Sequence, residues 1–242
     1  MELRFKSKGI LISSWLLENS HGNVIFCPGL PQYITKYHPI IKTFQALNFN
    51  VFLPRYYGTW ESSGIFNIKN SVKTVSETVH LVKTGRSKEL FGNQVVKWNK
   101  GPVILIGYSF GALPVLLNSI EPDINILICP FINYGFHDKR GPGERLSQTL
   151  KFLERGYSNV YRFNYTQLIK ELSLLKYPTK KGFILVSGRN DQSIPIGELD
   201  WLIDKYQVNK NKIFKFTGGH SADLPAPVWK NIISCTHKIK SN

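Results

Sequence analysis

Three side chains of this sequence have the types and the chain order that nucleophilic catalysis requires. Ser109 lies in the stretch GYSFG, Asp191 in GRNDQSIP and His220 in TGGHS. A neutral serine hydroxyl is a poor nucleophile, so a histidine must take its proton during attack on a carbonyl and return it to the leaving group. A carboxylate must hold the imidazole in one tautomer and stabilise its charged form. We therefore expect Ser109 as nucleophile, His220 as general base and Asp191 as its orienting acid.

The elements that must position these residues follow from hydrophobic periodicity, because a GxSxG stretch alone arises readily by chance. The pattern predicts strands at residues 3–5, 10–17, 23–27, 50–54, 102–106, 124–129, 182–186 and 213–216. It predicts helices at residues 33–47, 71–82, 109–120 and 196–206, and a last one from 226. Ser109, Asp191 and His220 each follow the carboxyl end of a predicted strand, which is where open parallel sheets bind ligands.

The alternation of strands and helices predicts an α/β fold. Strands that are apolar on both faces, separated by amphipathic helices, indicate a parallel sheet covered on both sides. Residues 131–181 interrupt the alternation with a glycine-rich loop and two helical patterns, near 146–153 and 165–175. We interpret them as an insertion within a single domain that spans residues 1–242.

The chain resembles the α/β-hydrolase superfamily, in which a serine, an acid and a histidine follow one another in this order. The likeness rests on four segments, PGLP, GYSFG, GRNDQSIP and TGGHS, and extends from about Leu11 to the last helix. It implies an α/β-hydrolase fold with a mostly parallel, doubly covered sheet of about eight strands. The insertion after the sixth strand is then expected to be a partial lid.

A tetrahedral intermediate also needs two preset amide donors for its oxyanion. One is expected to be the backbone amide of Phe110, at the start of the following helix. The second should come from the loop after the third strand, where Pro28 and Pro31 have no amide hydrogen. Gly29 and Leu30 remain, and the resemblance to the HGxP loop of the family favours Leu30.

Two prolines depart from the family pattern. Pro28 stands where the family often has histidine, which removes a hydrogen bond that could brace the loop. Pro114 falls early in the helix after Ser109, where it removes the bond to the Phe110 carbonyl.

Other residues compete for roles in the site. Asn190, Asp138 and Asp223 are rivals of Asp191, which we prefer because it follows a strand and precedes the Ile-Pro pair of the family pattern. The remaining histidines, at positions 21, 38, 80, 137 and 237, are expected to be packed or solvated. Tyr56, Tyr57 and Trp60 follow the strand at 50–54 and could line the pocket, with Tyr57 and Trp60 as the tentative pocket residues and with packing or surface positions as an at least equal alternative.

The resemblance implies a serine hydrolase that cleaves a carboxylic ester or thioester through an acyl-enzyme on Ser109. A serine peptidase of the aminopeptidase or acyl-peptidase kind is the nearest alternative. A binding protein that keeps the fold without turnover is an alternative from another class. The expected partner is a small acyl ester or a short peptide. No metal and no cofactor is expected, because the sequence has neither an HExxH-like spacing nor a phosphate-binding glycine loop.

The net charge of +15 comes from 31 Lys and Arg against 16 Asp and Glu. These cations are scattered along the chain, which favours a solvated basic surface over specific nucleic-acid binding, while non-specific polyanion binding stays open. The N-terminal residues show neither a signal-peptide core nor a transmembrane span. The three cysteines, at 27, 129 and 235, are far apart and predict buried thiols. We expect a cytoplasmic monomer or homodimer.

Overall fold

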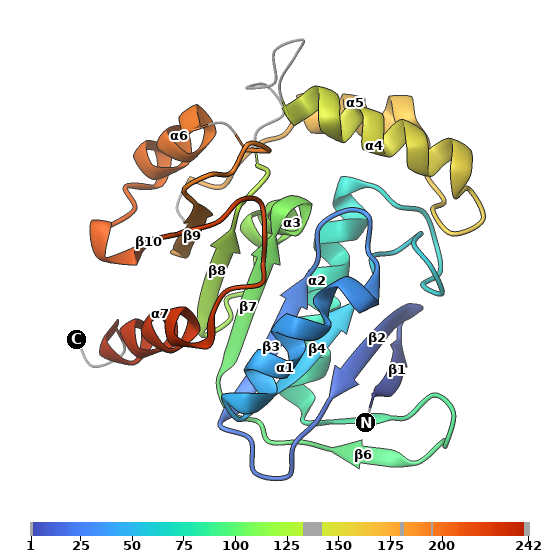
Figure 1. Ribbon diagram of the computed structural model, residues 1–242. Coiled ribbons are helices and arrows are strands. Elements are labelled where there is room, and N and C mark those ends of the chain that lie inside the picture. The colour runs from blue at the N-terminus through green and yellow to red at the C-terminus, as the bar shows by residue number, and fades with distance from the viewer. Residues whose placement is uncertain (1, 133–141, 180–181, 195, 240–242) are drawn as a thin grey trace.

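The computed structural model describes residues 2–132, 142–179, 182–194 and 196–239. Within them, eight strands form one sheet in the order β1-β2-β4-β3-β7-β8-β9-β10 (Figure 1). The strands are β1 (Leu3–Ser7), β2 (Ile10–Trp15), β3 (Gly22–Cys27), β4 (Phe49–Pro54), β7 (Val103–Tyr108), β8 (Ile124–Ile128), β9 (Ile184–Gly188) and β10 (Ile213–Phe216). β1, β2 and β4 pair antiparallel, and all pairs from β4 to β10 are parallel.

Helices cover both faces of this sheet, as the sequence predicts. One face packs against α1 (His38–Ala46) and α7 (Ala226–Ile239). The other packs against α2 (Ile68–Thr84), α3 (Ala112–Leu117) and α6 (Ile196–Tyr206). β2, β3, β4 and β7 are buried at every residue because they lie between the two layers. No described helix has both the length and the apolar content needed to span a bilayer.

Helix ends differ from the periodic prediction where capping residues act. α2 begins at Ile68, three residues before the predicted start, because the Asn67 side chain caps it by accepting the Asn70 amide at 2.7 Å. It ends at Thr84 and is capped by Gly85, whose φ of 71° lies in the left-handed region that glycine adopts at no steric cost. A polar side chain at a helix start thus extends the helix beyond its apolar stripe.

A small hairpin forms where the sequence indicates only a polar connection. It consists of β5 (Arg86–Lys88) and β6 (Val95–Lys97), and Trp98 directly follows it. The Trp98 indole donates to the Val82 carbonyl at 2.9 Å and its ring packs against Phe5 and Phe52. A buried tryptophan therefore anchors the hairpin to the edge of the main sheet.

Two helices of the insertion, α4 (Pro142–Gly156) and α5 (Tyr165–Ser173), lie between β8 and β9 in the chain. They correspond to the two helical patterns predicted there, and Figure 1 shows them beyond the carboxyl ends of the parallel strands. Tyr161, between them, forms a β-bridge with Thr59, and its hydroxyl oxygen accepts the Gln32 amide at 2.8 Å. The insertion is thus tied to the loops after β3 and β4.

Trp229 is the largest side chain between α7 and the sheet, and it is fully buried. Its ring centroid lies 4.7 Å from that of Phe44 on α1. Trp229→Ala is expected to lower the free energy of unfolding by about 3–5 kcal/mol, because it removes a buried aromatic ring and leaves a cavity. Urea unfolding measures the change. The control is Phe152→Ala, at a side chain that is 57% exposed on α4, and an equal loss in both variants would contradict this account.

Candidate active site

Ser109, His220 and Asp191 lie within hydrogen-bond distance of one another. The Ser109 Oγ is 2.9 Å from His220 Nε2, and His220 Nδ1 is 2.9 Å from Asp191 Oδ2. The three residues follow β7, β10 and β9, so parallel pairing brings positions far apart in the chain to one edge of the sheet. Such a chain of groups can move a proton from the serine hydroxyl to the imidazole and stabilise the resulting charge.

Ser109 stands on a sharp turn between β7 and a short 3₁₀ helix (Ser109–Gly111). Its φ of 52° is unusual for a residue with a side chain, and the turn projects the hydroxyl beyond the strand. A Cβ at Gly111 would lie 2.1 Å from the Cys27 carbonyl oxygen, and one at Gly107 would lie 2.5 Å from the Ala112 Cα. Both glycines are therefore required by close backbone contacts. Pro114 falls in the first turn of α3, where a missing amide hydrogen is tolerated.

Asp191 is fixed by its own loop. Its side chain is 4% exposed, and its Oδ1 accepts the amides of Ser193 at 2.7 Å and Ile194 at 3.1 Å. Burial acts to raise the pKa of Asp191, but hydrogen bonding and charge from His220, with the two amides, outweigh it and hold the pKa below its ordinary value. The carboxylate is thus ionised and aimed at the imidazole.

Tyrosine hydroxyls position the backbone around Ser109. The hydroxyl of Tyr108 donates to the His220 carbonyl at 3.1 Å, and that of Tyr56 to the Pro28 carbonyl at 2.9 Å. The hydroxyl of Tyr37 donates to the Gly29 carbonyl at 3.3 Å. Because a trans peptide points its carbonyl and its amide hydrogen in opposite directions, Tyr37 directs the Leu30 amide away from itself. No hydrogen bond from that amide to another described residue is found.

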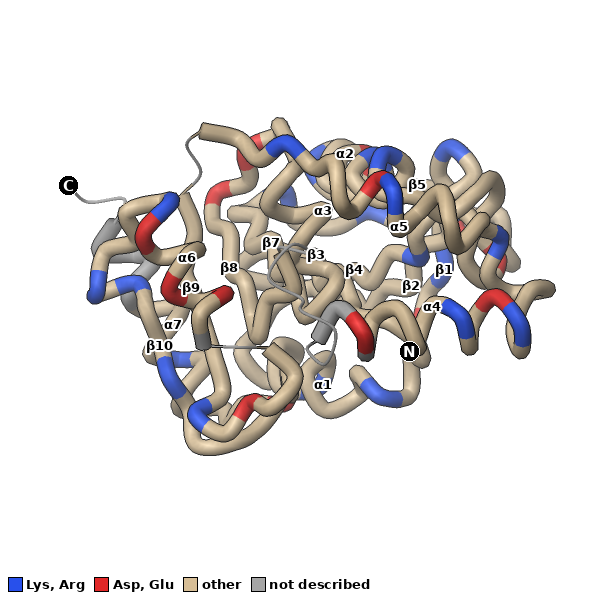
Figure 2. The backbone as a smooth tube through the Cα atoms, turned by 90° about the horizontal axis from the view of Figure 1, so that it is seen from above, with Lys and Arg blue, Asp and Glu red and all other residues tan. Residues whose placement is uncertain are grey.

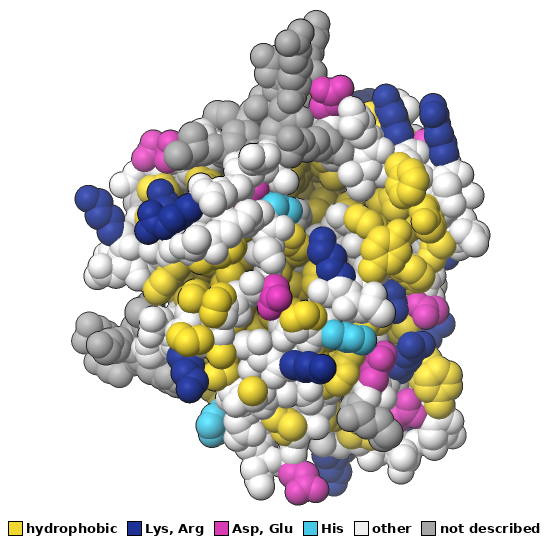
Figure 3. All heavy atoms as spheres, in the orientation of Figure 1, with side chains coloured by type: hydrophobic (Ala, Val, Ile, Leu, Met, Phe, Trp, Pro, Cys, Tyr) yellow, Lys and Arg dark blue, Asp and Glu magenta, His cyan; other side chains and the backbone are white. Residues whose placement is uncertain are grey.

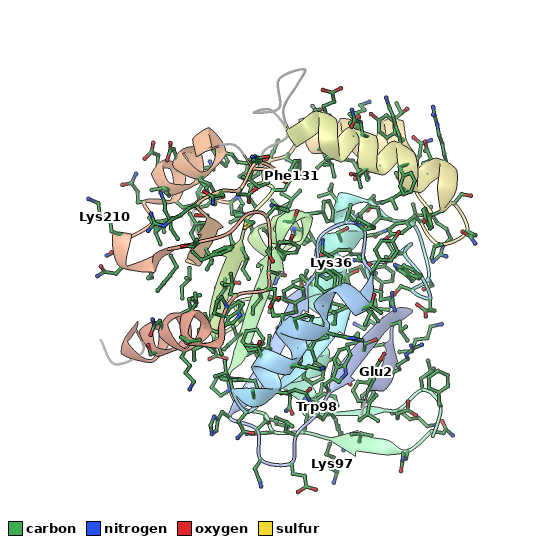
Figure 4. The ribbon with its side chains drawn as sticks, viewed as in Figure 1. Glu2, Lys36, Lys97, Trp98, Phe131 and Lys210 are labelled. Carbon is green, nitrogen blue, oxygen red and sulfur yellow. The ribbon has the colours of Figure 1, made fainter. Side chains whose placement is uncertain are left out.

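A pocket of about 250 Å³ opens beside Ser109 and His220. Its other lining residues are Leu30, Phe110, Phe131, Leu146, Thr149, Ser193 and Ile194. Leu146 and Thr149 come from α4, and Figure 4 shows Phe131 beneath that helix. Seen from above, β3 and β7 at the centre of the molecule carry no charged residue (Figure 2). Five of the nine described residues that line the pocket are apolar, and none is a carboxylate.

Tyr57 and Trp60, the tentative pocket residues, are not among the residues that line this pocket. The Tyr57 hydroxyl donates to the Lys8 carbonyl at 2.8 Å, toward the turn between β1 and β2. The Trp60 ring lies 5.0 Å from the Arg55 guanidinium and 6.4 Å from the Tyr161 ring. Both side chains therefore pack against neighbouring elements rather than beside Ser109.

The rivals of Asp191 do not join the chain of hydrogen bonds around His220. No described hydrogen bond links Asn190 or Asp223 to that imidazole, and the Asp223 side chain is exposed. Asp138 and His137 lie outside the described residues. Of the alternatives considered from the sequence, the structure brings Asp191 to the histidine.

Four residues near the site have contacts that the sequence does not predict. Tyr108 follows an apolar run, Tyr37 lies in a predicted helix, and Tyr56 is indicated only as a tentative pocket residue, although each donates to a carbonyl of the site. Cys129, with a φ of 42°, places its thiol sulfur within 4.8 Å of donor atoms of Asp191 and His220. Only the folded sheet shows that these positions meet.

Cys129, Asp191 and His220 are also the group of described residues whose donor atoms could hold a metal ion. A metal ligand must be deprotonated, whereas burial raises the pKa of the Cys129 thiol to about 12. The Asp191 carboxylate and the imidazole already bond to each other at 2.9 Å. The arrangement therefore fits a hydrogen-bonded acid–base pair better than a metal centre.

Comparison with known proteins identifies the fold. No protein-family model and no curated protein sequence matches the chain. Among solved structures, DcsB in complex with its substrate analogue aligns with a TM-score of 0.67 and 15% identity, over 100% of this chain and 98% of DcsB. Mouse alpha/beta hydrolase domain-containing protein 10 aligns with a TM-score of 0.62 and 17% identity, over 100% and 99%.

An esterase from Pyrococcus furiosus aligns with a TM-score of 0.65 and 17% identity, over 99% of this chain and 90% of the esterase. These structures are similar to this chain along nearly their whole lengths. The chain thus has the α/β-hydrolase fold, as the four sequence segments imply, with its mostly parallel sheet covered on both faces.

The lowered pKa of Asp191 predicts a pH-dependent contribution to stability. Above the ordinary value of 3.8 the ionised carboxylate stabilises the fold, and this contribution is lost as pH falls through the lower folded-state value. The unfolding free energy of the wild type, minus that of Asp191→Asn, is therefore expected to shrink below about pH 4. Urea unfolding at acidic and neutral pH measures the difference, with the exposed Asp223→Asn as control. A difference that stays constant into strong acid would contradict the prediction.

Proposed function

We propose that this protein is a serine hydrolase that cleaves carboxylic ester or thioester bonds through an acyl-enzyme on Ser109. The observation that carries the proposal is the chain of two 2.9 Å contacts from Ser109 Oγ through His220 to Asp191 beside an apolar pocket. His220 takes the hydroxyl proton as Ser109 attacks the acyl carbon, and then returns the proton to the departing alcohol or thiol. Water, activated by the same imidazole, releases the acid.

The oxyanion formed during attack is assigned to the backbone amides of Leu30 and Phe110. Both residues line the pocket next to Ser109, and a Cβ at Gly29 would lie 2.9 Å from that of Ser109. Phe110 is the second residue of a helical turn, where amide hydrogens have no intrahelical acceptor. Tyr37 is a positioning residue in this scheme, because its bond to the Gly29 carbonyl sets the direction of the Leu30 amide.

An ester is favoured over a peptide by the chemistry of the pocket walls. An aminopeptidase must hold the charged amino terminus of its substrate, which calls for a carboxylate near the nucleophile. The described lining has none, and its Leu30, Phe110, Phe131, Leu146 and Ile194 suit an acyl chain. In this proposal α4 acts as a partial lid, because it contributes Leu146 and Thr149 to the pocket.

The first test is covalent labelling with a serine-directed fluorophosphonate. The wild type is expected to label and to hydrolyse nitrophenyl esters, and Ser109→Ala is expected to lose labelling and about 10³-fold or more of the activity. Ser193→Ala, a second serine at the same pocket, is the matched control and keeps both. If the wild type is not labelled, the hydrolase proposal is wrong and a binding role is favoured. Fast turnover of aminoacyl nitroanilides without ester cleavage would instead favour a peptidase.

Leu146 is expected to set the preferred acyl-chain length because it projects from α4 into the pocket. Leu146→Ala should shift the optimum of kcat/KM in a nitrophenyl ester series toward longer chains, by about two carbons, since each buried methylene contributes differential binding. Leu150→Ala, a buried position on the same helix outside the pocket, is the control and should lower stability without moving the optimum. An identical shift in both variants would refute a direct role for Leu146.

A further inference from the structure

The β5–β6 hairpin presents a face to solvent that the proposed hydrolysis does not use. In its antiparallel register Arg86 lies opposite Lys97, and Lys88 lies opposite Val95. Directly opposed residues project from the same side of a hairpin, so these four side chains share one face. All four are exposed, Val95 to 63%. Val96, on the other side, packs against the hydrophobic core and fixes which face is turned outward.

The cations of this face have no acidic partners within the described chain. Lys100 follows the hairpin closely in sequence. Arg86, Lys97, Trp98 and Lys100 together line part of one groove. No ion pair to a described Asp or Glu is found for Arg86, Lys88, Lys97 or Lys100. Like charges placed directly opposite, as Arg86 and Lys97 are, destabilise an antiparallel pair. An external anion would remove that repulsion.

The turn at the end of the hairpin holds apolar side chains outward. Phe91 is 75% exposed and Leu90 is 41% exposed. The acid of this segment, Glu89, is turned inward, where its carboxylate accepts the amides of Phe91 and Gly92. The Leu90 amide donates to the Arg4 carbonyl at 2.8 Å, which ties the turn to β1. The backbone of the turn is therefore fixed, and the Arg4 guanidinium lies 5.9 Å from the centroid of the exposed Phe91 ring.

We propose that the hairpin face binds the surface of an anionic phospholipid bilayer. The hairpin face comprises Arg86, Lys88, Leu90, Phe91, Val95, Lys97 and Lys100. Its cations complement acidic headgroups, and its apolar residues at the turn enter the boundary between headgroups and acyl chains. Single-stranded nucleic acid fits less well, because base stacking needs a series of aromatic rings and this face offers mainly aliphatic side chains beside one phenylalanine.

The hairpin face lies at the opposite end of the molecule from the pocket. Figure 4 places Lys97 at the bottom of the view and Phe131, which lines the pocket, near the top. A hydrophobic side chain is exposed at the lower right of the space-filling view, where Figure 1 places the loop of the hairpin (Figure 3). Binding through this face leaves the pocket open to water, so the inference holds whatever reaction Ser109 performs.

Sedimentation with vesicles of phosphatidylcholine, with and without phosphatidylserine, tests the proposal on the full-length chain. Wild type is expected to sediment with the phosphatidylserine vesicles alone and to be released by salt. Arg86→Glu with Lys97→Glu should weaken binding about tenfold or more. Lys210→Glu with Lys215→Glu is the matched control, because it changes the net charge equally on exposed side chains elsewhere and should keep near-wild-type binding. Circular dichroism reports folding in every variant.

Leu90→Ser with Phe91→Ser separates lipid insertion from simple charge attraction, and should reduce vesicle binding about fivefold or more at constant net charge. Absence of wild-type binding to anionic vesicles overturns the proposal, as do equal losses in the two charge-reversed pairs. Unchanged binding of the variant with Leu90→Ser and Phe91→Ser also overturns the proposal, since Leu90 and Phe91 then do not enter the bilayer. Tighter binding to a single-stranded RNA oligonucleotide, abolished by the Arg86 and Lys97 reversals, would assign the face to nucleic acid instead.

Discussion

The turn that carries Ser109 crosses the end of β3 with no space for a side chain between the two backbones. A Cβ at Gly111 would lie 2.1 Å from the Cys27 carbonyl oxygen, and the rest of the site depends on this approach. It brings the loop after β3 against the turn after β7, so that Gly29 lies beside Ser109. The proposed nucleophile and the proposed oxyanion donors are thereby set by one contact between main chains. The positions of the side chains in the site follow from this backbone contact.

The buried tyrosines connect this contact to the hydrophobic core. Tyr37, Tyr56 and Tyr108 pack among apolar side chains, and each hydroxyl donates to a carbonyl at the edge of the site. Burial raises the pKa of all three, so the hydroxyls stay protonated and keep donating. A buried hydroxyl without a partner is costly, and satisfying it with these carbonyls orients the loops. The core and the site are therefore specified by the same groups.

The sequence predicts the fold and the positions of Ser109, Asp191 and His220 because strong local patterns indicate both. Apolar runs mark most strands of the main sheet, and Ser109, Asp191 and His220 lie within four residues of the ends of three of them. The β5–β6 hairpin is not predicted because its strands are short and mostly polar. It is held by the packing of Trp98 on Phe52, a residue distant in sequence. Periodicity reports what is buried and where strands end.

The pocket could not be predicted for a related reason. Its walls come from six separate segments, and their meeting depends on how α4 packs over the sheet. Tyr57 and Trp60 follow a strand as the site residues do, yet the chain after β4 turns them toward other neighbours. Periodicity does not report the path of a loop after its strand.

The positions of β7 and β10 in the sheet give Ser109 and His220, the proposed nucleophile and general base, unequal support. Ser109 follows β7, which has strands on both sides, whereas His220 follows β10, an edge strand paired only with β9 and partly exposed. Local opening starts where neighbours are fewest. On warming, we therefore expect the segment after β10, which carries His220, to open before the serine turn does. In the proposed hydrolase such opening would give an inactive but folded state, from which recovery requires one edge strand to pair again rather than the whole chain to refold.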